Sequence, residues 1–318
     1  MNKKSDEFLS YISRLYYYKN QTQQEISKLV GISRLKVNRL LKEARERGIV
    51  RIWIDEKNDS FSKLEESMRK TFNLYRVIIC NSAPDDVLIR RNLGITGAKY
   101  LAENIRLFSS LAFSWGRTVW EVVHRLEDSP VTHKYPIDIV QINGGTSQIF
   151  NDTEPAEIGQ TLARTLSGRY YFLHAPALMG SSKLCSAVMA DKYISETLNR
   201  ARNADLALIG IGSLRDFALR KLRYISQTEF MNLEKSGIVG DIALRFFDIN
   251  GKKVDNFLNS RLIGLTLEEI KRIPHVVGIA GGNLKIESIL GALRTKIINV
   301  LIIDEKTARE VMLLNSKS

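Results

Sequence analysis

Cysteine and histidine are scarce in this sequence. Its 318 residues include two cysteines, Cys80 and Cys185, and four histidines. The cysteines lie far apart and form no CxxC pair, and the histidines are scattered, which argues against a disulfide framework and against a metal site. Each cysteine is more typical of a small apolar core residue than of a reactive thiol. We therefore expect neither a metal nor another cofactor.

Long apolar runs are also missing. No run approaches the ~18–20 residues of a membrane-spanning helix, and the first ten residues, MNKKSDEFLS, lack the apolar stretch of a secretory signal. The sequence therefore predicts a protein of the cytoplasm with no membrane partner. Its 44% of hydrophobic residues is ordinary for a folded chain, and its length allows about two domains.

Positive charge is abundant and unevenly placed. The formal net charge is +12, and residues 1–57 hold 13 Lys or Arg against 7 Asp or Glu, which is half of the excess. Concentrated positive charge favours a polyanionic partner, although a basic segment can also be a solvated face. We expect a domain boundary near residue 57, with domains over 1–57 and 58–318.

Two short helices joined by a glycine turn are predicted between residues 22 and 47. Thr22 and Glu25 have the spacing of a capping box, Gly31 allows a sharp turn, and Ser33 can cap the second helix. The apolar residues stand where a helix-turn-helix packs its two helices: Ile26, Val30, Ile32, Val37 and Leu40. The segment IVRIWI that follows is typical of a short strand, such as part of a wing.

The other face of the second helix is polar and basic. In a helix-turn-helix this face enters the major groove of double-stranded DNA, where Arg reads guanine, Asn reads adenine and Lys or Ser holds phosphates. The alternative is a basic helical hairpin with a purely structural use. The residues expected to contact DNA are Thr22, Gln23, Ser33, Arg34, Lys36, Asn38, Arg39 and Lys42.

The charged segment NDSFSKLEESMRKTFNL carries an apolar stripe of Phe61, Leu64, Met68 and Phe72. The spacing predicts a helix of about three turns. This stripe can pack onto the larger domain or serve self-association, and the pattern does not favour either.

From Tyr75 onward, short apolar runs alternate with amphipathic segments, which predicts an α/β domain with a largely parallel sheet. One block, GDIALRFFDINGKKVD, differs, because two strand-like runs flank Asn250-Gly251 and indicate a hairpin. The strand candidates are YRVIIC, SSLAFSW, IDIVQI, YYFLHAP, DLALIGIG, VVGIAGG and NVLIID.

Three of these strands are followed by glycine-containing turns: WGRT, NGGTS and AGGNLK. Ligands of open α/β sheets bind beyond the carboxyl ends of the strands, and a helix N-terminus after such a turn offers free N–H groups to an anion. The three turns together favour an anionic small molecule, although each can be a tight connection only. No GxGxxG or GxxxxGK[ST] motif is present, so dinucleotide and P-loop sites are disfavoured.

These motifs, in order along nearly the whole chain, resemble the SorC family of sugar-binding transcriptional regulators. The resemblance rests on TQQEISKLVGISRLKVNRLLKEARERGIVRI, SWGRT, QINGG, APAL, GIVGDIALRFFDINGKKV, AGGNLKIESILGAL and VLIIDEKTA. It implies a winged helix-turn-helix domain followed by a larger α/β sensor domain similar to glucosamine-phosphate deaminases and ribose-phosphate isomerases. It also implies a phosphorylated sugar effector, a repressor, and a homo-oligomer, commonly a tetramer.

The resemblance also implies the residues of the effector site. Thr118 and Lys285 would bind the phosphate, and Asp241 would accept hydrogen bonds from sugar hydroxyls, although Asp241 can also be a turn cap and Lys285 a solvated lysine. The full expected set is Gly116, Arg117, Thr118, Asn143, Gly144, Gly145, Glu154, Asp241 and Lys285.

The preferred function is a DNA-binding transcriptional regulator that is not an enzyme. The alternative is a sugar-phosphate isomerase or deaminase with a DNA-binding appendage. Such an enzyme needs a general base in its site. Asp241 and Glu154 can be proposed for that role, but no acid/base pair with a convincing spacing is visible.

Overall fold

The structure is a computed structural model, and it describes residues 3–17, 19, 21–47, 49–50, 61–128, 136–146, 155–221 and 223–317. The chain divides into two compact units, Met1–Asn58 and Asp59–Ser318. Each unit has its own hydrophobic core, so each is described by itself.

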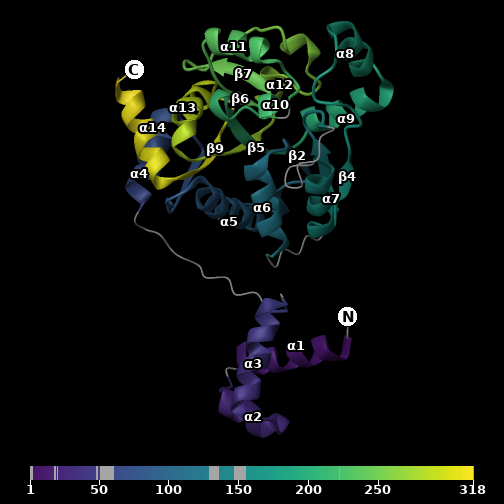
Figure 1. Cartoon of the computed structure of the whole chain (residues 1–318), viewed down its shortest axis with the longest axis vertical. Helices are drawn as coiled ribbons and strands as arrows, with labels where there is room; N and C mark the ends of the chain where they lie inside the picture. Colours follow the sequence, from purple (N-terminus) through teal and green to yellow (C-terminus); the bar gives the residue numbers. More distant parts are fainter. Residues whose placement is uncertain are drawn as a thin grey trace. The chain divides into compact units, whose positions relative to one another are not determined.

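Three helices form the described part of the first unit: α1 (Lys3–Tyr17), α2 (Gln23–Val30) and α3 (Arg34–Glu46) (Figure 1). The predicted capping box is confirmed, because the Glu25 N–H donates to Thr22 Oγ1 and the Thr22 N–H donates to the Glu25 carboxylate. Gly31 ends α2 with a φ of 69°, and the Ser33 hydroxyl accepts the Lys36 N–H at the start of α3. The local sequence therefore dictates where both helices begin and where α2 ends.

The core of the first unit is small. Ile12 of α1, Ile26 of α2 and Val37 and Leu41 of α3 are buried together, while Val30, Ile32 and Leu40 pack partly buried against them. The predicted apolar face is thus present, but Leu41 takes the central place expected for Leu40, because Leu41 stands four residues after Val37 and so lies on the same side of α3. Most of the strand predicted over residues 49–54 lies outside the described residues.

The apolar stripe after residue 60 belongs to the larger unit. Phe61 and Met68 of helix α4 (Ser62–Phe72) are buried in the main core, and Leu64 and Phe72 pack against it. Of the two alternatives left open by the sequence, packing onto the larger unit is confirmed.

The larger unit is built on a parallel sheet with strand order β1-β9-β8-β5-β2-β3-β4. All seven predicted strands are present and pair in parallel. Their bounds are β1 (Arg76–Cys80), β2 (Ser110–Phe113), β3 (Asp138–Gln141), β4 (Arg169–Tyr171), β5 (Leu206–Ser213), β8 (His275–Ile279) and β9 (Val300–Asp304).

Helices cover both faces of this sheet (Figure 1). Strand β9 shows the pattern, because Val300 and Ile302 face one cluster while Leu301 and Ile303 face the other. A strand buried on both faces must be apolar throughout, which explains the continuous apolar runs of the sequence. One face packs against α5 (Asp86–Asn104), α6 (Arg117–Glu127) and α7 (Pro155–Thr165); the other packs against α4, α9 (Lys192–Arg202), α13 (Ile286–Arg294) and α14 (Glu305–Lys317).

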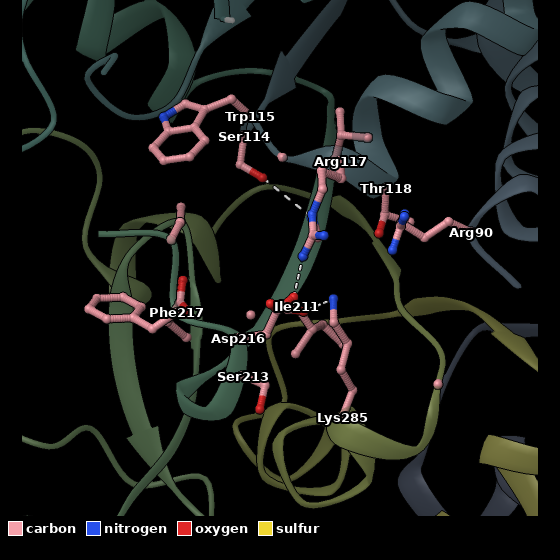
Figure 2. Close-up of a pocket in the computed structure, with 18 of the residues that line it drawn as sticks. Arg90, Ser114, Trp115, Arg117, Thr118, Ile211, Ser213, Asp216, Phe217 and Lys285 are labelled. Atoms are coloured by element: carbon pink, nitrogen blue, oxygen red, sulfur yellow. Dashed lines mark hydrogen bonds and ion pairs between the residues drawn. The ribbon is translucent and has the colours of Figure 1, made fainter. Parts of the chain in front are cut away.

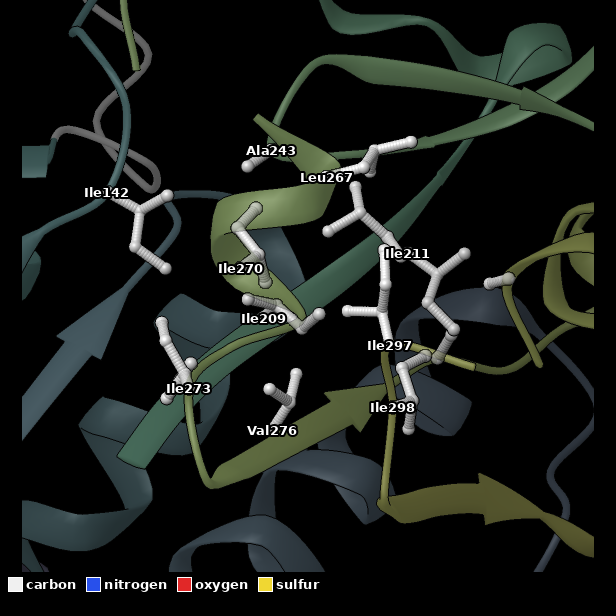
Figure 3. Packing of buried hydrophobic residues seen from close by; sticks show 14 of the residues in the cluster. Ile142, Ile209, Ile211, Ala243, Leu267, Ile270, Ile273, Val276, Ile297 and Ile298 are labelled. Atoms are coloured by element: carbon white, nitrogen blue, oxygen red, sulfur yellow. The ribbon is translucent and has the colours of Figure 1, made fainter. Parts of the chain in front are cut away.

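The second cluster, part of which Figure 3 shows, joins Ile209 of β5 and Ile298, which precedes β9, to Ile270 of helix α12 (Leu267–Ile270). Cys185 of α8 (Ser182–Met189) is buried in the same cluster, whereas α10 (Ala218–Lys221) and α11 (Gln227–Lys235) contribute to a separate one. In the described part of the chain, no helix has both the length and the apolar composition that crossing a membrane requires.

The predicted turn at Asn250-Gly251 is present, and a second turn that was not predicted precedes it. Strands β6 (Ile238–Ile242) and β7 (Arg245–Asp248) are antiparallel and are joined at Ala243-Leu244, both with positive φ. Asn250-Gly251 forms the next turn, after β7, and leads to a single bridge between Phe247 and Lys253. The sequence did not indicate the first turn, because neither Ala nor Leu favours a positive φ. The Leu244 N–H donates to Asp241 Oδ2 at 2.9 Å, and this contact helps to hold the turn.

Strand order reverses between β2 and β5. The chain runs outward from β2 to β3 and β4, then returns to the other side of β2 with β5 and continues to β8 and β9. Such a reversal leaves a crevice at the carboxyl ends of the two central strands. The β6–β7 hairpin pairs with the last residues of β5 and borders this crevice.

Candidate functional site

A cavity of about 140 Å³ lies at this reversal, beyond the carboxyl ends of β2, β5 and β8. It brings together six of the nine residues expected for the effector site: Gly116, Arg117, Thr118, Asn143, Asp241 and Lys285. Glu154 lies outside the described residues. These segments are far apart in the sequence, so the fold creates the site.

The turn SWGRT leads from β2 into the N-terminus of α6. Gly116 has a φ of 149°, and no atom lies within 4 Å of the position that a Cβ would occupy there. Thr118 is buried in the first turn of α6, while the Arg117 side chain is 45% exposed. The first N–H groups of a helix have no partner within the helix, so this end of α6 presents donors and a favourable dipole to the cavity.

Lys285 stands at the start of α13, after the short helix η5 (Asn283–Lys285). Its Nζ donates to the Ile211 carbonyl at the end of β5, at 2.8 Å, and Figure 2 shows the amine pointing into the cavity. It is therefore not a solvated lysine. Burial lowers the pKa of Lys285 to about 8, aided by Arg117 and Arg90 and opposed by Asp216 and Asp241.

Asp241 is a buried carboxylate in β6. It pairs with Gly212 of β5, where a Cβ would lie 2.0 Å from Asp241 Oδ1, so only glycine leaves room for this side chain. Burial raises the pKa of Asp241 to about 6, although the Leu244 N–H and the Lys285 charge act in the opposite direction. Asp241 thus caps the turn and also lines the cavity, so the two sequence interpretations are compatible.

The turn NGG contributes one residue to the cavity. Asn143 is buried and lines it, and among the described residues no group hydrogen-bonds to Asn143 Oδ1. Gly144 and Gly145 do not line it. A Cβ on Gly144 would lie 2.4 Å from the Pro176 carbonyl oxygen, and Gly145 exchanges backbone hydrogen bonds with Ala175 and Ala177. The glycines therefore allow two backbone segments to pack closely.

Sequence reasoning missed several residues of the cavity. Asp216, from helix η3 (Leu214–Asp216), forms ion pairs with Arg117 and Lys221. Burial disfavours the charged form of Asp216, but Lys221, Arg117 and Lys285 outweigh this effect and lower its pKa. Arg90 reaches the cavity from α5 and lies beside Thr118 (Figure 2). Neither residue follows a strand within a glycine turn, so no motif pointed to it.

The lining of the cavity therefore offers two kinds of polar group. Arg90, Arg117, Lys285 and the N-terminus of α6 offer positive charge and N–H donors. Asp241 and Asn143 offer acceptor oxygens, one of them without a partner among the described residues. Such an arrangement can hold a molecule with an anionic group at one end and hydroxyl groups at the other.

The residues expected to contact DNA gather in the first unit. Ser33, Arg34, Lys36, Asn38, Arg39 and Lys42 are all exposed on α3 or at its start. Thr22 is exposed, and Gln23 is half-buried beside it at the start of α2. Lys42 Nζ lies 3.7 Å from Oε1 of Glu46, which stands four residues further along the helix. The basic face predicted for this helix is therefore present and faces solvent.

Both cysteines are buried. Burial, together with the Asp304 charge, raises the pKa of the Cys80 thiol to about 12. A thiol in such surroundings is not ionised near neutral pH, which agrees with the interpretation as core residues.

Comparison with known proteins extends over both units. The model of the family described as "Putative sugar-binding domain" matches residues 57–313. The deoxyribonucleoside regulator of Bacillus subtilis (strain 168) is 31% identical over 314 residues, which cover 98% of this chain and 99% of that protein. The transcriptional regulator LsrR of Escherichia coli (strain K12) is 32% identical over 312 residues, covering 96% and 95%.

A solved structure is similar over almost the same length. The full-length sorbitol operon regulator SorC from Klebsiella pneumoniae has a TM-score of 0.80 and 28% identity, covering 96% of this chain and 98% of that chain. The matched family model, the two curated relatives and this fold lead to one conclusion: the chain belongs to the SorC family of sugar-binding transcriptional regulators.

Proposed function

We propose that this transcriptional regulator binds an operator through residues 1–57 and that a phosphorylated sugar, bound in the cavity of residues 58–318, controls this binding. The proposal includes a winged helix-turn-helix in the first unit and an isomerase-like sensor fold in the second. It also includes action as a repressor in the cytoplasm, assembly as a homo-oligomer, with a tetramer preferred, and no catalytic activity.

The observation that carries the proposal is the placement of cationic groups around the start of α6. Arg117, Lys285 and the free N–H groups of α6 border the same cavity. A helix N-terminus with two cationic side chains beside it suits a phosphate, which carries about two negative charges near neutral pH. Thr118 can add a hydroxyl donor from the first turn of the helix.

Two other residues of the cavity, Asp241 and Asn143, suit the hydroxyl groups of a sugar. Asp241 Oδ2 accepts one hydrogen bond from the Leu244 N–H, and its carboxylate still has acceptor capacity. Asn143 Oδ1 is buried and lacks a partner among the described residues, so a ligand hydroxyl that donates to it would satisfy a polar group whose burial is otherwise costly. We also keep Gly116, Gly144, Gly145 and Glu154 in the proposed effector site. Gly144 and Gly145 would serve this site through the close backbone packing that they allow.

For DNA, the exposed face of α3 supports the proposal. Arg34 and Asn38 lie near the start of the helix, which is the part that reaches base edges in a helix-turn-helix. Ser33, Lys36, Arg39, Lys42, Thr22 and Gln23 are placed to contact phosphates or neighbouring bases.

A panel of sugar phosphates, each paired with its unphosphorylated parent, tests the proposal by thermal shift. A ligand that binds only the folded protein at a hundred times its Kd adds about 2.7 kcal/mol to the stability. We expect at least one phosphorylated sugar to raise the melting temperature and to change operator binding, while its parent does neither. A panel in which parents and phosphates behave alike would contradict a phosphate site.

One observation favours a second function, a sugar-phosphate isomerase or deaminase. The pKa of Asp241 is raised to about 6, and this value is suitable for a general base. Incubation of the protein with each sugar phosphate that binds, followed by analysis for isomerised or deaminated product, distinguishes the two. We expect no turnover, and turnover that is lost in Asp241→Asn would establish the enzyme.

A further inference from the structure

Asp216 is an acidic side chain among the cationic residues that line the cavity. Its two carboxylate oxygens have different partners: Oδ2 accepts from Arg117 Nη2, and Oδ1 accepts from Lys221 Nζ. In Figure 2 the Arg117 side chain extends toward Asp216, and the Lys285 amine lies in the same region. The Asp216 carboxylate therefore already pairs with Arg117, a cation that the proposed phosphate would also bind.

The segment around Asp216 is fixed by burial on both sides. Leu214, Phe217 and Leu219 are buried in a cluster with Phe230 and other apolar residues. The backbone at Asp216 is therefore held in place, and the ion pair with Arg117 can separate by rotation of either side chain, of which Arg117 is the more exposed. Lys221 belongs to the same segment, so Asp216 keeps this partner when it leaves Arg117.

We propose that Asp216 is an internal competitor for the anion site: it binds Arg117 when the cavity is empty and gives Arg117 up to the anionic group of the ligand. The inference rests on the proposed function, because it concerns the same site. It makes Asp216 a residue that sets how strongly an anion must bind before it can occupy the site. A ligand carboxylate would offer Arg117 only the kind of ion pair that it already has, whereas a phosphate ester brings more charge and three acceptor oxygens. Competition by Asp216 would weaken every anion by the same factor, so a sugar phosphate would still occupy the site at concentrations at which a sugar acid, the weaker ligand, would not.

The opposite role for Asp216 predicts the opposite result. If Asp216 served to position Arg117 for the ligand, its removal would leave the guanidinium disordered and weaken anion binding. If Asp216 competes with the ligand, its removal strengthens anion binding. The sign of the change therefore separates the two roles.

Methyl phosphate and acetate are suitable probes, since they carry the two anionic groups without a sugar. We would titrate the full-length chain with each at about pH 7, where methyl phosphate is mostly dianionic. The wild type should bind methyl phosphate and bind acetate much more weakly. Asp216→Asn should bind both about two- to fivefold more tightly, the range expected from loss of one partly exposed ion pair.

Two further variants make the test specific. In an Arg117→Met background, Asp216→Asn should give a much smaller gain, because the ion pair with Arg117 is absent and only the effect of the Asp216 charge on Lys285 is left. Glu287→Gln is the matched control: it removes the same charge from a residue that pairs with Arg215 and does not line the cavity. It should leave both affinities unchanged.

The outcomes distinguish this inference from the proposed function. Methyl phosphate binding that is equal or weaker in Asp216→Asn would overturn the inference and leave the phosphate site intact. A gain of undiminished size in the Arg117→Met background would also overturn it. If neither the wild type nor Asp216→Asn binds methyl phosphate, both the inference and the proposed phosphate site fail.

Discussion

The helical unit and the cavity of the larger unit assemble their polar residues in opposite ways. The proposed DNA-contacting residues of α3 fall within ten consecutive positions, Ser33 to Lys42, and all six are exposed. The polar residues of the cavity come from α5, the start of α6, the end of β3, η3, β6 and η5, between Asp86 and Lys285. The exposed face belongs to a single helix, whereas the lining of the cavity is brought together by the order of the strands in the sheet.

This difference predicts how the two regions respond to substitution. A side chain on the exposed face of α3 can be removed with little effect on packing, so its loss should change binding alone. A side chain in the cavity touches several elements, so its loss can change binding and stability together.

The largest effect is expected on DNA binding. Arg34→Ala or Asn38→Ala should relax base preference and cost on the order of 1–3 kcal/mol each in operator affinity, because each is placed to read a base. Lys42→Ala should weaken binding to all sequences and reduce its salt dependence. Binding to operator and to scrambled DNA at several salt concentrations checks this. Unchanged operator affinity in both Arg34→Ala and Asn38→Ala would show that α3 is not the recognition helix.

The second effect concerns the packing beneath the cavity. Gly212→Ala places a Cβ 2.0 Å from Asp241 Oδ1, so Asp241 and the turn at Leu244 must shift. We expect the larger unit to lose about 2 kcal/mol of stability, as overpacking of a core does. Gly210→Ala is the control, because its Cβ would lie 3.9 Å from the nearest atom, on Val119. Denaturation of both variants measures the loss of stability. If Gly212→Ala were as stable as Gly210→Ala, the Asp241 side chain would be able to move away from the added Cβ without cost, and the prediction would be wrong.

The third effect is a pH dependence of effector binding. Burial lowers the pKa of Lys285 to about 8, and a phosphate prefers the protonated amine. Affinity for a phosphorylated effector should therefore be level between about pH 7 and pH 8, where the phosphate is already mostly dianionic, and fall as the pH rises further, by up to about tenfold per pH unit. Lys285→Arg keeps its charge over this range, so in that variant the decrease should disappear. A decrease of the same size in Lys285→Arg would assign it to another group.

Much of the fold could be predicted from the sequence. The alternation of apolar strands with amphipathic helices was enough for all seven parallel strands, and Thr22, Gly31 and Ser33 marked the helix ends of the first unit. These features depend on residues close in the chain. The turn at Ala243-Leu244 was missed because tertiary contacts, including the one from Asp241, stabilise a backbone that neither residue prefers.

The cavity could be predicted only in part. The turn SWGRT and Lys285 were found because each follows a strand in a recognisable motif. The turn NGG looked similar, yet Gly144 is required by the Pro176 backbone that crosses it, and a sequence does not show which segment crosses which. Arg90 and Asp216 were missed for the same reason, since only the strand order brings them to the start of α6.

The most direct test of the account is a calorimetric titration of the wild type and Lys285→Ala with a phosphorylated sugar and its unphosphorylated parent, alongside operator binding. A ligand shifts DNA affinity only through its different affinities for the two states of the protein, typically by about 1–3 kcal/mol, and the effect is reciprocal. Lys285→Ala should bind the phosphorylated sugar far more weakly, bind the parent almost as the wild type does, and keep its ligand-free operator affinity. Equal losses for both forms of the sugar, or unaltered binding of the phosphorylated form, would contradict the proposed phosphate site.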